Sequence, residues 1–259
     1  MAGSTEKRRS DIIGYMSHSH SVTVAELSQQ FAVSEVSIRR DLQYLEDMGL
    51  LKRVHGGAVN LSRALQQDPL AEKRQYQLDK KERIGAVAAR LIKSGNRVIL
   101  DSGSTVMQVA HKISAAPSSF GSLNIITASM PVVRELGRCP GINLILLGGI
   151  YLPEYDVVVG PQTVEQLKSL HADIVFLGTD GMTLTQGLTT SNVLEAEVDR
   201  AMAKASTQII VLSDSSKIGV IGLATIMPIT RIQKLVTDQD APEEFVGALQ
   251  AQGIEVILA

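Results

Sequence analysis

Hydrophobic residues near the start of the chain recur at a helical spacing. Ile38, Leu42 and Leu45 fall on one side of a predicted helix that runs from Ser34 to Met48. Ser34 is suited to begin it, because its hydroxyl accepts a hydrogen bond from an otherwise unpaired amide of the first turn. Gly49 follows as the glycine expected just past a helix C-terminus. The pattern predicts an amphipathic helix with one buried and one exposed face.

Two shorter helices are predicted before this one. Residues 6–17 form the first helical pattern. Thr23 and Glu26 then have the spacing of a capping box, and Leu27 and Phe31 belong to the apolar face that follows it. Two short helices joined by a tight turn form a helix-turn-helix unit, whose second helix enters the major groove of DNA.

The exposed face of the second helix carries side chains that suit DNA. Guanidinium groups bond guanine, amides bond adenine, and hydroxyls bond the phosphate backbone. The candidate DNA-contacting residues are Ser34, Val36, Ser37, Arg39, Arg40 and Gln43 on the helix, and Lys52, Arg53 and His55 on a hairpin-like wing over LLKRVHGGA. One short recognition helix reads few base pairs, so a homo-oligomer, at least a dimer, on repeated half-sites of double-stranded DNA is expected.

After residue 96 short apolar runs alternate with helical patterns. This alternation predicts an α/β fold, a Rossmann-like and mostly parallel sheet with helices on both faces. The predicted strands are Val98–Leu100, Asn124–Thr127, Asn143–Leu147, Ile174–Leu177, Ile209–Leu212, Leu235–Thr237 and Glu255–Leu258. The predicted helices are Val106–Ile113, Pro131–Leu136, Gln162–Leu170, Leu194–Ser206 and Pro242–Gln252, after a helical pattern that builds from Ala71.

The segments that follow the predicted strands are small, hydroxylic and rich in glycine. Ligands of open α/β sheets bind at the carboxyl ends of the strands. The first of these segments holds Ser102, Gly103, Ser104 and Thr105 before a helix, where backbone amides and hydroxyls make an anion site. We therefore predict a phosphate cradle there, with Lys217 as an added cation.

Composition and missing motifs narrow the function. Neither GxGxxG after a strand nor GxxxxGK[ST] is present, which disfavours NAD and ATP, and no cofactor is predicted. The chain of 259 residues has a formal net charge of −2, so DNA affinity depends on where its cations lie.

A lone Cys139 excludes an internal disulfide and a cysteine-rich zinc site, and no metal site is predicted. Without a long apolar run or a signal-peptide pattern, a cytoplasmic protein is expected.

The N-terminal signature of the DeoR family of bacterial transcriptional regulators resembles one stretch of this chain, TVAELSQQFAVSEVSIRRDLQYLEDMGLLKRVHGGA. Val36 and Ser37 stand where the family often has threonine. The resemblance implies a winged helix-turn-helix that binds specific DNA sequences, usually to repress sugar-utilisation operons. Further along, DSGST, LLGG, FLGTDG, GLTT and DSSK are similar to the effector domain of the same family, whose fold resembles ribose-phosphate isomerases and CoA transferases.

That second resemblance implies a phosphorylated sugar or a related metabolite as the effector. Carried over by position, the effector-binding candidates are Asp101, Ser102, Gly103, Ser104, Thr105, Thr127, Ser129, Gly149, Asp180, Thr189, Asp214 and Lys217. The expected organisation is a winged helix-turn-helix over residues 1–59, a linker and connecting helix over 60–80, and an α/β effector domain over 81–259.

Two alternatives to an effector-controlled regulator remain open from the sequence. One is an active sugar-phosphate isomerase with a DNA-binding appendage. Against it, only Asp180 and Asp214 stand where the isomerases carry their acid–base cluster, so no catalytic residue is predicted and the chain is not expected to be an enzyme. The other is a regulator whose effector is a free sugar, a nucleoside or an acyl-CoA.

Overall fold

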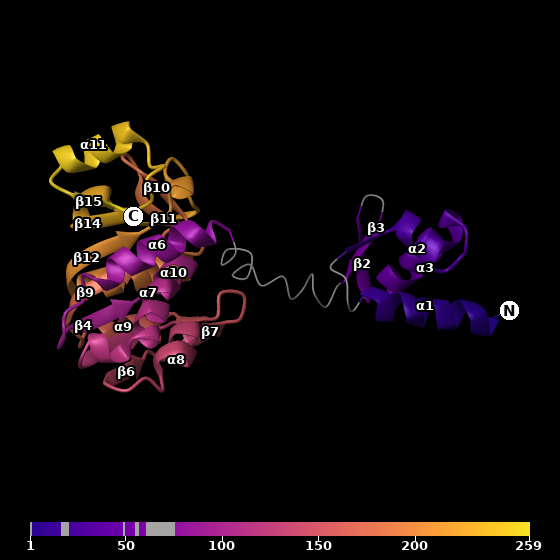
Figure 1. The fold of residues 1–259 in the computed structure, drawn as a ribbon, viewed down its shortest axis with the longest axis horizontal. Helices are drawn as coiled ribbons and strands as arrows, with labels where there is room; N and C mark the ends of the chain where they lie inside the picture. Colours follow the sequence, from indigo (N-terminus) through magenta and orange to yellow (C-terminus); the bar gives the residue numbers. More distant parts are fainter. Residues whose placement is uncertain (1, 17–20, 49, 55–56, 61–75) are drawn as a thin grey trace. The chain divides into compact units, whose positions relative to one another are not determined.

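The chain forms two compact units, residues 1–68 and 69–259. The computed structural model describes residues 2–16, 21–48, 50–54, 57–60 and 76–259 (Figure 1). Each unit has a hydrophobic core of its own, and each is described here separately. No helix in the described ranges has the length and apolar content needed to cross a membrane.

The first unit is a winged helix-turn-helix, as the sequence predicts. Its helices are α1 (Ala2–Met16), α2 (Val24–Gln30) and α3 (Glu35–Asp47), and its strands are β1 (Ser21–Thr23), β2 (Leu51–Val54) and β3 (Gly57–Asn60). The strands form an antiparallel sheet in the order β1–β3–β2, so the predicted wing hairpin is β2–β3. Strand β1 was not predicted. It pairs with β3 so closely that a Cβ on Gly57 would lie 2.1 Å from the carbonyl oxygen of Val22.

Local hydrogen bonds begin both helices of the motif. The Thr23 hydroxyl accepts from the amide of Glu26, whose carboxylate accepts from the amide of Thr23, which is the predicted capping box. The Ser34 hydroxyl accepts from the amide of Ser37 at the start of α3. Ile38, Leu42 and Leu45 are then buried together against α1 and α2, and the predicted stripe is confirmed. Gly49 lies outside the described residues.

A buried carboxylate joins α1 to α3. Asp41 is 1% exposed, and its two oxygens accept hydrogen bonds from Nε of Arg8 (2.7 Å) and Nε of Arg9 (2.8 Å). The Arg9 guanidinium also lies 3.8 Å from the ring centre of Tyr44. Two of the cations near the N-terminus are therefore used to hold the unit together.

The second unit contains a seven-stranded, wholly parallel sheet in the order β15–β14–β12–β9–β4–β5–β6. Every predicted strand is present in it, within three residues at either end. The strands are β4 (Arg97–Leu100), β5 (Leu123–Thr127), β6 (Ile142–Leu146), β9 (Ala172–Leu177), β12 (Ser206–Leu212), β14 (Lys234–Thr237) and β15 (Glu255–Leu258). In sequence order the strands are added outward from β4 to β6, and the chain then returns to the other side of β4 at β9. The strand order therefore reverses between β4 and β9.

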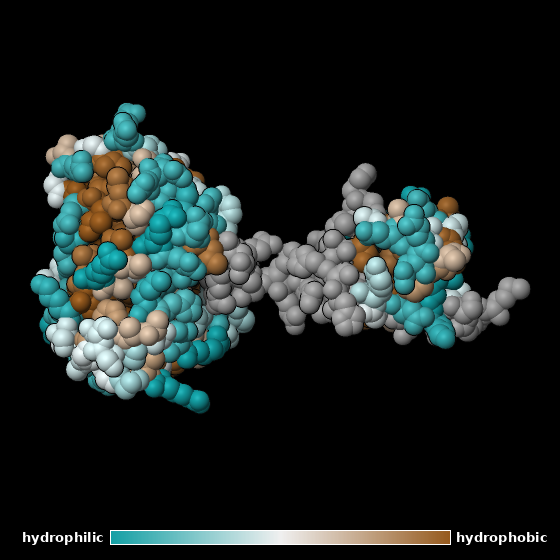
Figure 2. All heavy atoms as spheres, in the orientation of Figure 1, coloured by the Kyte–Doolittle hydropathy of each residue, from teal (hydrophilic) through white to brown (hydrophobic). Residues whose placement is uncertain are grey.

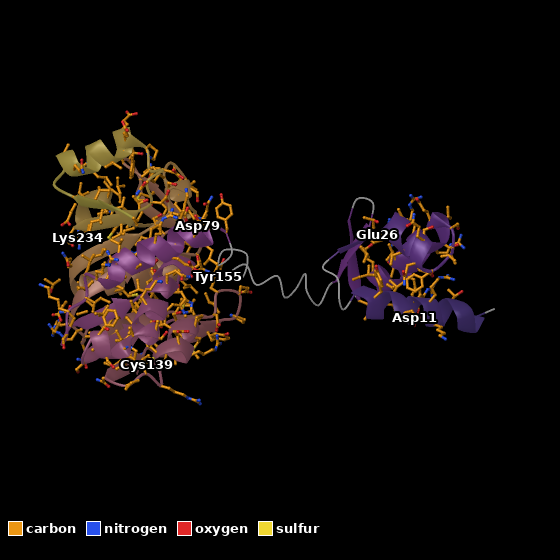
Figure 3. All side chains as sticks on the ribbon, in the orientation of Figure 1. Asp11, Glu26, Asp79, Cys139, Tyr155 and Lys234 are labelled. Atoms are coloured by element: carbon orange, nitrogen blue, oxygen red, sulfur yellow. The ribbon has the colours of Figure 1, made fainter. Side chains whose placement is uncertain are left out.

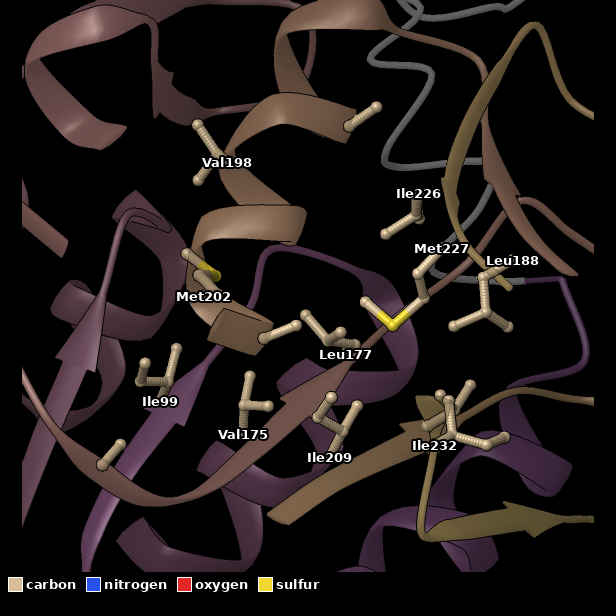
Figure 4. Close-up of a cluster of buried hydrophobic side chains, with 14 of the residues drawn as sticks. Ile99, Val175, Leu177, Leu188, Val198, Met202, Ile209, Ile226, Met227 and Ile232 are labelled. Carbon is tan, nitrogen blue, oxygen red and sulfur yellow. The ribbon is translucent and has the colours of Figure 1, made fainter. Parts of the chain in front are cut away.

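Helices cover both faces of this sheet, as predicted. On one face lie α6 (Leu78–Ala89), α7 (Ser104–Ala115) and α8 (Met130–Leu136), and on the other α9 (Pro161–Leu167), α10 (Val193–Lys204) and α11 (Glu243–Ala251). Figure 4 shows Met202 of α10 facing Ile99 and Val175 of the sheet, and all three belong to one buried cluster. The single cysteine, Cys139, is half-buried at the edge of the core beneath α6–α8 (Figure 3).

Helix α6 begins at Leu78 and packs tightly on α7. A Cβ on Gly85 would lie 2.3 Å from Cβ of Gln108, so glycine permits this close approach of the two helices. The helical pattern was predicted from Ala71, but residues 71–75 lie outside the described ranges. Residues 78–80, which were predicted to belong to the linker and connecting helix, are part of the second unit because they form the start of α6.

Small antiparallel elements that the periodicity did not indicate complete the unit. One is a three-stranded sheet in the order β10–β11–β13, made of Gly181–Thr183, Gly187–Thr190 and Ala224–Met227. The other is a ribbon of β7 (Ile150–Leu152) and β8 (Val157–Val159). The 3₁₀ turns are η1 (Pro117–Ser119), η2 (Ser215–Lys217) and η3 (Ile229–Arg231). Figure 2 shows hydrophobic residues gathered over the side of the unit where β12, β14 and β15 lie.

The buried ion pairs of the first unit lead to a stability prediction. Asp41→Ala leaves two guanidinium groups without their buried carboxylate, so the free energy of unfolding of the first unit should fall by about 3–5 kcal/mol. The control is Glu35→Ala, which removes an exposed carboxylate bonded to Arg39 and should cost less than about 0.5 kcal/mol. Thermal unfolding followed by circular dichroism measures both. Equal losses in the two variants would contradict the structural role of Asp41.

Candidate functional site

A cavity of about 680 Å³ opens at the carboxyl ends of β4, β9 and β12. It lies where the strand order reverses between β4 and β9, the place where open α/β sheets bind ligands. The residues that line it come chiefly from these strand ends, from the N-terminal parts of α6, α7 and α10, and from the turn between β7 and β8 through Tyr155 (labelled in Figure 3).

Asp101 holds the floor of the cavity together. It follows β4 and is 7% exposed, and its carboxylate accepts hydrogen bonds from the amides of Ser102 (2.5 Å) and Gly178 (2.9 Å). Gly178 follows β9, so one side chain bridges the two strands between which the sheet reverses. Burial raises the pKa of Asp101, and the bonds from the two amides oppose that rise.

Asp199 of α10 lies against Asp101 and is protonated more readily than an ordinary aspartate. Burial raises its pKa well above the usual 3.8, and the charges of Asp101 and Glu195 raise it further. A hydrogen bond joins the carboxyl groups of Asp199 and Asp101. Two buried carboxyl groups in contact disfavour double ionisation, so this pair is protonated more readily than two separate aspartates.

The predicted phosphate cradle forms the first turn of α7. The first intrahelical bond runs from the amide of Met107 to the carbonyl of Gly103 (2.9 Å), so the amides of the residues between them precede the helical ladder. Ser104 and Thr105 are buried at the cavity wall. Gly103 is extended, with φ of −177°, and a Cβ there would meet only the Cα of Gly178 at 3.9 Å. The turn has the geometry of an anion site at a helix N-terminus.

Two lysines add positive charge to the cavity. Lys217 belongs to η2, which Asp214 begins by accepting a hydrogen bond from the amide of Ser216 (3.1 Å). Lys81 lies in α6 and is 2% exposed, and its Nζ donates to the backbone carbonyl of Tyr76 (2.6 Å). Both lysines line the cavity, as does Tyr76 itself.

Opposite charges come from the β9–α10 side. The carboxylate of Asp180 accepts from the amide (2.9 Å) and hydroxyl (2.6 Å) of Ser191 and from the hydroxyl of Thr190 (3.3 Å). Glu195 sits in the first turn of α10, whose N-terminus Asn192 caps. The cavity is therefore lined by helix amides and ammonium groups as well as by a set of carboxylates.

The exposed face of α3 in the first unit is the other candidate site. Val36 is 63% exposed there, and Arg40 lies one turn further along the same face. Among the described residues Arg40 makes no hydrogen bond or ion pair, whereas Arg39 is bonded to Glu35 (2.6 Å). Of the remaining predicted contacts, Arg53 donates to the side chain of Gln43 next to this face.

Comparisons with known proteins identify the family. A model described as "DeoR-like helix-turn-helix domain" matches residues 8–64. A second, described as "DeoR C terminal sensor domain", matches residues 76–239, which is more than half of the chain. The chain belongs to the DeoR family of transcriptional regulators. The resemblance seen in the sequence is thereby confirmed.

Relatives named as transcriptional regulators or repressors match over most of their length and of this chain. The HTH-type transcriptional regulator GolR of Listeria innocua is 33% identical over 98% of this chain and 98% of its own. The transcriptional repressor AccR of Agrobacterium fabrum is 30% identical over 91% and 90%. Among solved structures, ribose 5-phosphate isomerase A of Methanocaldococcus jannaschii aligns at 19% identity and a TM-score of 0.41 over 54% of each chain, a likeness of fold alone.

The structure of this DeoR-family member brings most of the predicted effector residues together and leaves four outside. Those that line the cavity are Asp101, Ser102, Gly103, Ser104, Thr105, Asp180, Asp214 and Lys217. Thr127 is buried beneath it, donating to the carbonyl of Leu100 (2.7 Å). Ser129 caps α8 and borders only a smaller hollow of about 10 Å³ next to Ser102 and Tyr155.

Gly149 and Thr189 have structural roles away from the cavity. Gly149 has φ of +157°, and a Cβ there would lie 2.3 Å from Oγ1 of Thr163, so its position requires glycine. Thr189 is 1% exposed in β11, where its hydroxyl donates to the carbonyl of Gly181 (3.0 Å) and accepts from the amide of Gly222 (2.8 Å). Gly149 lies between β6 and β7, and Thr189 lies within β11. Neither lines the cavity, although Thr190, the next residue of β11, does.

Several cavity residues were not predicted. They are Tyr76, Lys81, Tyr155, Gly178, Thr179, Thr190, Glu195, Asp199, Ser213 and Ile226. Glu195 and Asp199 lay within a helix whose charges suggested a solvated outer face. Their spacing of four residues places both on one side of α10, which is the signal that could have indicated them. In the first unit, His55 lies outside the described residues, as does the side chain of Lys52.

The buried carboxyl pair leads to a prediction of pH dependence. The folded state keeps a proton on Asp199 that the unfolded chain releases above about pH 4, so the pair should lower the free energy of unfolding increasingly as the pH rises above that value. Asp199→Asn keeps a donor to Asp101 but does not titrate. The stability of this variant relative to wild type should therefore increase from pH 5 to pH 8 in urea unfolding experiments.

An aspartate with the opposite shift provides the control. The hydrogen bonds from Arg97 lower the pKa of Asp173, so its stabilising contribution is complete above pH 4 and is lost only in acid. Asp173→Asn should thus differ from wild type by a constant amount between pH 5 and pH 8. Parallel curves for wild type and Asp199→Asn would contradict the raised pKa of Asp199.

The unpaired cation of α3 leads to a prediction of DNA affinity. A bidentate arginine–guanine contact is worth about 1–3 kcal/mol, so Arg40→Ala should weaken specific DNA binding roughly 5- to 150-fold at constant salt. Arg83→Ala is the control, since Arg83 is an exposed arginine of the second unit that pairs with Asp79. Fluorescence anisotropy with a labelled duplex measures both. Unchanged affinity in Arg40→Ala would remove Arg40 from the DNA interface.

Proposed function

We propose that this DeoR-family regulator is a repressor of a carbohydrate-utilisation operon, and that a phosphorylated sugar bound in the cavity controls its affinity for operator DNA. One observation carries the proposal. The same cavity contains the N-terminal turn of α7 and two lysines, which suit a phosphate, and a group of carboxylates, which suit hydroxyl groups. AccR, one of the relatives, is itself named a repressor.

The two kinds of lining divide the ligand into two ends. The phosphate is assigned to the first turn of α7, where the hydroxyls of Ser104 and Thr105 and the amides of the turn supply donors. Lys217 and Lys81 neutralise its charge. The sugar hydroxyls are assigned to Asp180 and Glu195 across the cavity. A phosphorylated effector brings negative charge to the amides of this turn and to the lysines, which a free sugar or a nucleoside does not, and this favours a phosphorylated effector.

We propose that the start of α6 transmits the effect of ligand binding from the cavity to the rest of the chain. Nζ of Lys81 holds the carbonyl of Tyr76, the first described residue after 61–75. The neighbouring Lys80 pairs with Asp238 (2.9 Å) and Asp240 (2.7 Å), which anchors the same turn to the end of β14. A phosphate that attracts Lys81 competes with the Tyr76 carbonyl for the ammonium group and so alters the turn at the start of α6. The coupling is reciprocal, so DNA must change effector affinity by the same factor.

The proposed partners are operator DNA and further copies of the chain. Helix α3 has 13 residues, and one such helix contacts too few base pairs for specificity in a genome. A homo-oligomer on repeated half-sites solves this limitation. Because its partner is chromosomal DNA, we place its action in the cytoplasm.

We also propose that the protein binds its effector without converting it to a product. A general base must be ionised and free to approach the proton that it removes. Asp101 and Asp180 accept backbone amides, and burial raises the pKa of Asp199 well above its usual value. Glu195 is the carboxylate that favours the rival, a sugar-phosphate isomerase. Incubation with aldose and ketose phosphates, followed by chromatography, tests this rival, and conversion that is lost in Glu195→Gln would support it.

The phosphate assignment is tested at Gly103. A side chain fits there without a clash, so Gly103→Asp should fold and yet place a carboxylate at the phosphate position. A panel of phosphorylated and free sugars is screened by thermal unfolding. At 100 times its Kd an effector should stabilise the wild type by about 2.7 kcal/mol, and Gly103→Asp should lose this stabilisation.

Gly103→Ser is the matched control, because serine adds a side chain of similar size without the charge and suits a helix N-cap. It should keep effector binding within a few-fold of wild type. Both variants should bind operator, but Gly103→Asp should no longer respond to the effector. A normal response in Gly103→Asp would place the phosphate elsewhere.

A further inference from the structure

Val36 is an apolar side chain that the first unit does not use for folding. The other branched apolar residues of α3, which are Ile38, Leu42 and Leu45, are at most 3% exposed, whereas Val36 is 63% exposed. A β-branched residue is also a weaker helix former than alanine. Its presence at this position therefore gains nothing in core packing and little in helix stability.

The position of Val36 places it among groups that suit DNA. It is the second residue of α3, and residues of the first turn of a recognition helix contact base edges in the major groove. Arg40 follows one turn later on the same side and has no polar partner among the described residues. The hydroxyls of Ser34 and Ser37 lie 3.0 Å apart at the start of the same helix. Serine hydroxyls are among the groups that bond DNA phosphate oxygens.

Base edges in the major groove offer one apolar group, the C5-methyl of thymine. We propose that Val36 packs against a thymine methyl in each half-site and so selects thymine there, an inference that rests on DNA binding through α3. One helical turn separates Val36 from Arg40, about 5.4 Å, against about 3.4 Å for each base pair. The thymine thus lies within about two base pairs of the base or phosphate that Arg40 contacts.

Uracil substitution tests this contact, because uracil is thymine without the methyl group. The full-length protein first selects its sites from a random double-stranded DNA pool. Each thymine of the selected site is then replaced singly by deoxyuridine, and the affinity is measured at one salt concentration. Replacement of one particular thymine in each half-site should weaken protein binding about fourfold, the value expected from the loss of one buried methyl group.

Variants assign that methyl group to Val36. Val36→Ala should fold normally, since the residue is exposed, and should bind the thymine site more weakly. It should bind the thymine and uracil sites about equally, which is the non-additivity expected of two groups in contact. Met48→Ala is the control, because Met48 is 59% exposed but lies at the opposite end of α3, so its uracil effect should equal that of wild type.

The outcomes separate this contact from the proposed function. A selected site without uracil sensitivity, or an unchanged sensitivity in Val36→Ala, overturns the thymine contact and leaves DNA binding standing. Failure to select any sequence overturns both.

Discussion

The hydrogen bonds of the Asp101 carboxylate fix the geometry on which the cavity depends. A parallel sheet that reverses its strand order leaves a gap beyond the carboxyl ends of two neighbouring strands, here β4 and β9. Asp101 closes the base of that gap by bonding the amide of Gly178 across it and the amide of Ser102 beside it. The same carboxylate meets Asp199 of α10, so the strand ends and the first turns of two helices are positioned around one buried charge.

That arrangement explains how a cavity rich in carboxylates still suits an anion. Several of the acidic groups already accept backbone amides, as Asp101, Asp180 and Asp214 do, and the Asp101–Asp199 pair is protonated more readily than two separate aspartates. Their negative charge is thus partly compensated within the protein. The amides of α7 and the two lysines are the groups to which we assign the phosphate of the proposed effector, and Lys81 also bonds the carbonyl of Tyr76.

The first unit shows a similar division between structural and interacting charge. Arg8 and Arg9 lie close to the DNA-binding motif in sequence, but both are bonded to the buried Asp41. Arg39 is bonded to Glu35, whereas Arg40 and Val36 project from α3 without such contacts. A balance of seven basic and seven acidic residues over positions 1–60 is therefore compatible with a DNA interface. The acidic partners neutralise particular cations and leave others available.

Local rules were enough to predict much of this protein. Capping at Thr23 and Ser34, the stripe on α3 and all seven strands of the main sheet followed from sequence spacing, because each depends on residues that are neighbours in the chain or on a repeating period. The glycine and hydroxyl residues after β4 were likewise correctly placed at the cavity wall.

Glu195, Asp199 and Lys81 were missed because their helices look amphipathic and solvated in sequence, and only the packing of α10 and α6 directs these side chains inward. Thr127, Gly149 and Thr189 show the converse, because their positions at or near strand ends suggested a ligand contact. The hydroxyls of Thr127 and Thr189 instead make hydrogen bonds within the protein, and Gly149 allows a close approach of neighbouring atoms. The sequence by itself thus determined the family, the strands of the main sheet and the position of the glycine- and hydroxyl-rich turn after β4. The tertiary structure alone decided which polar groups face the cavity, because that depends on how segments distant in the chain pack around the strand ends.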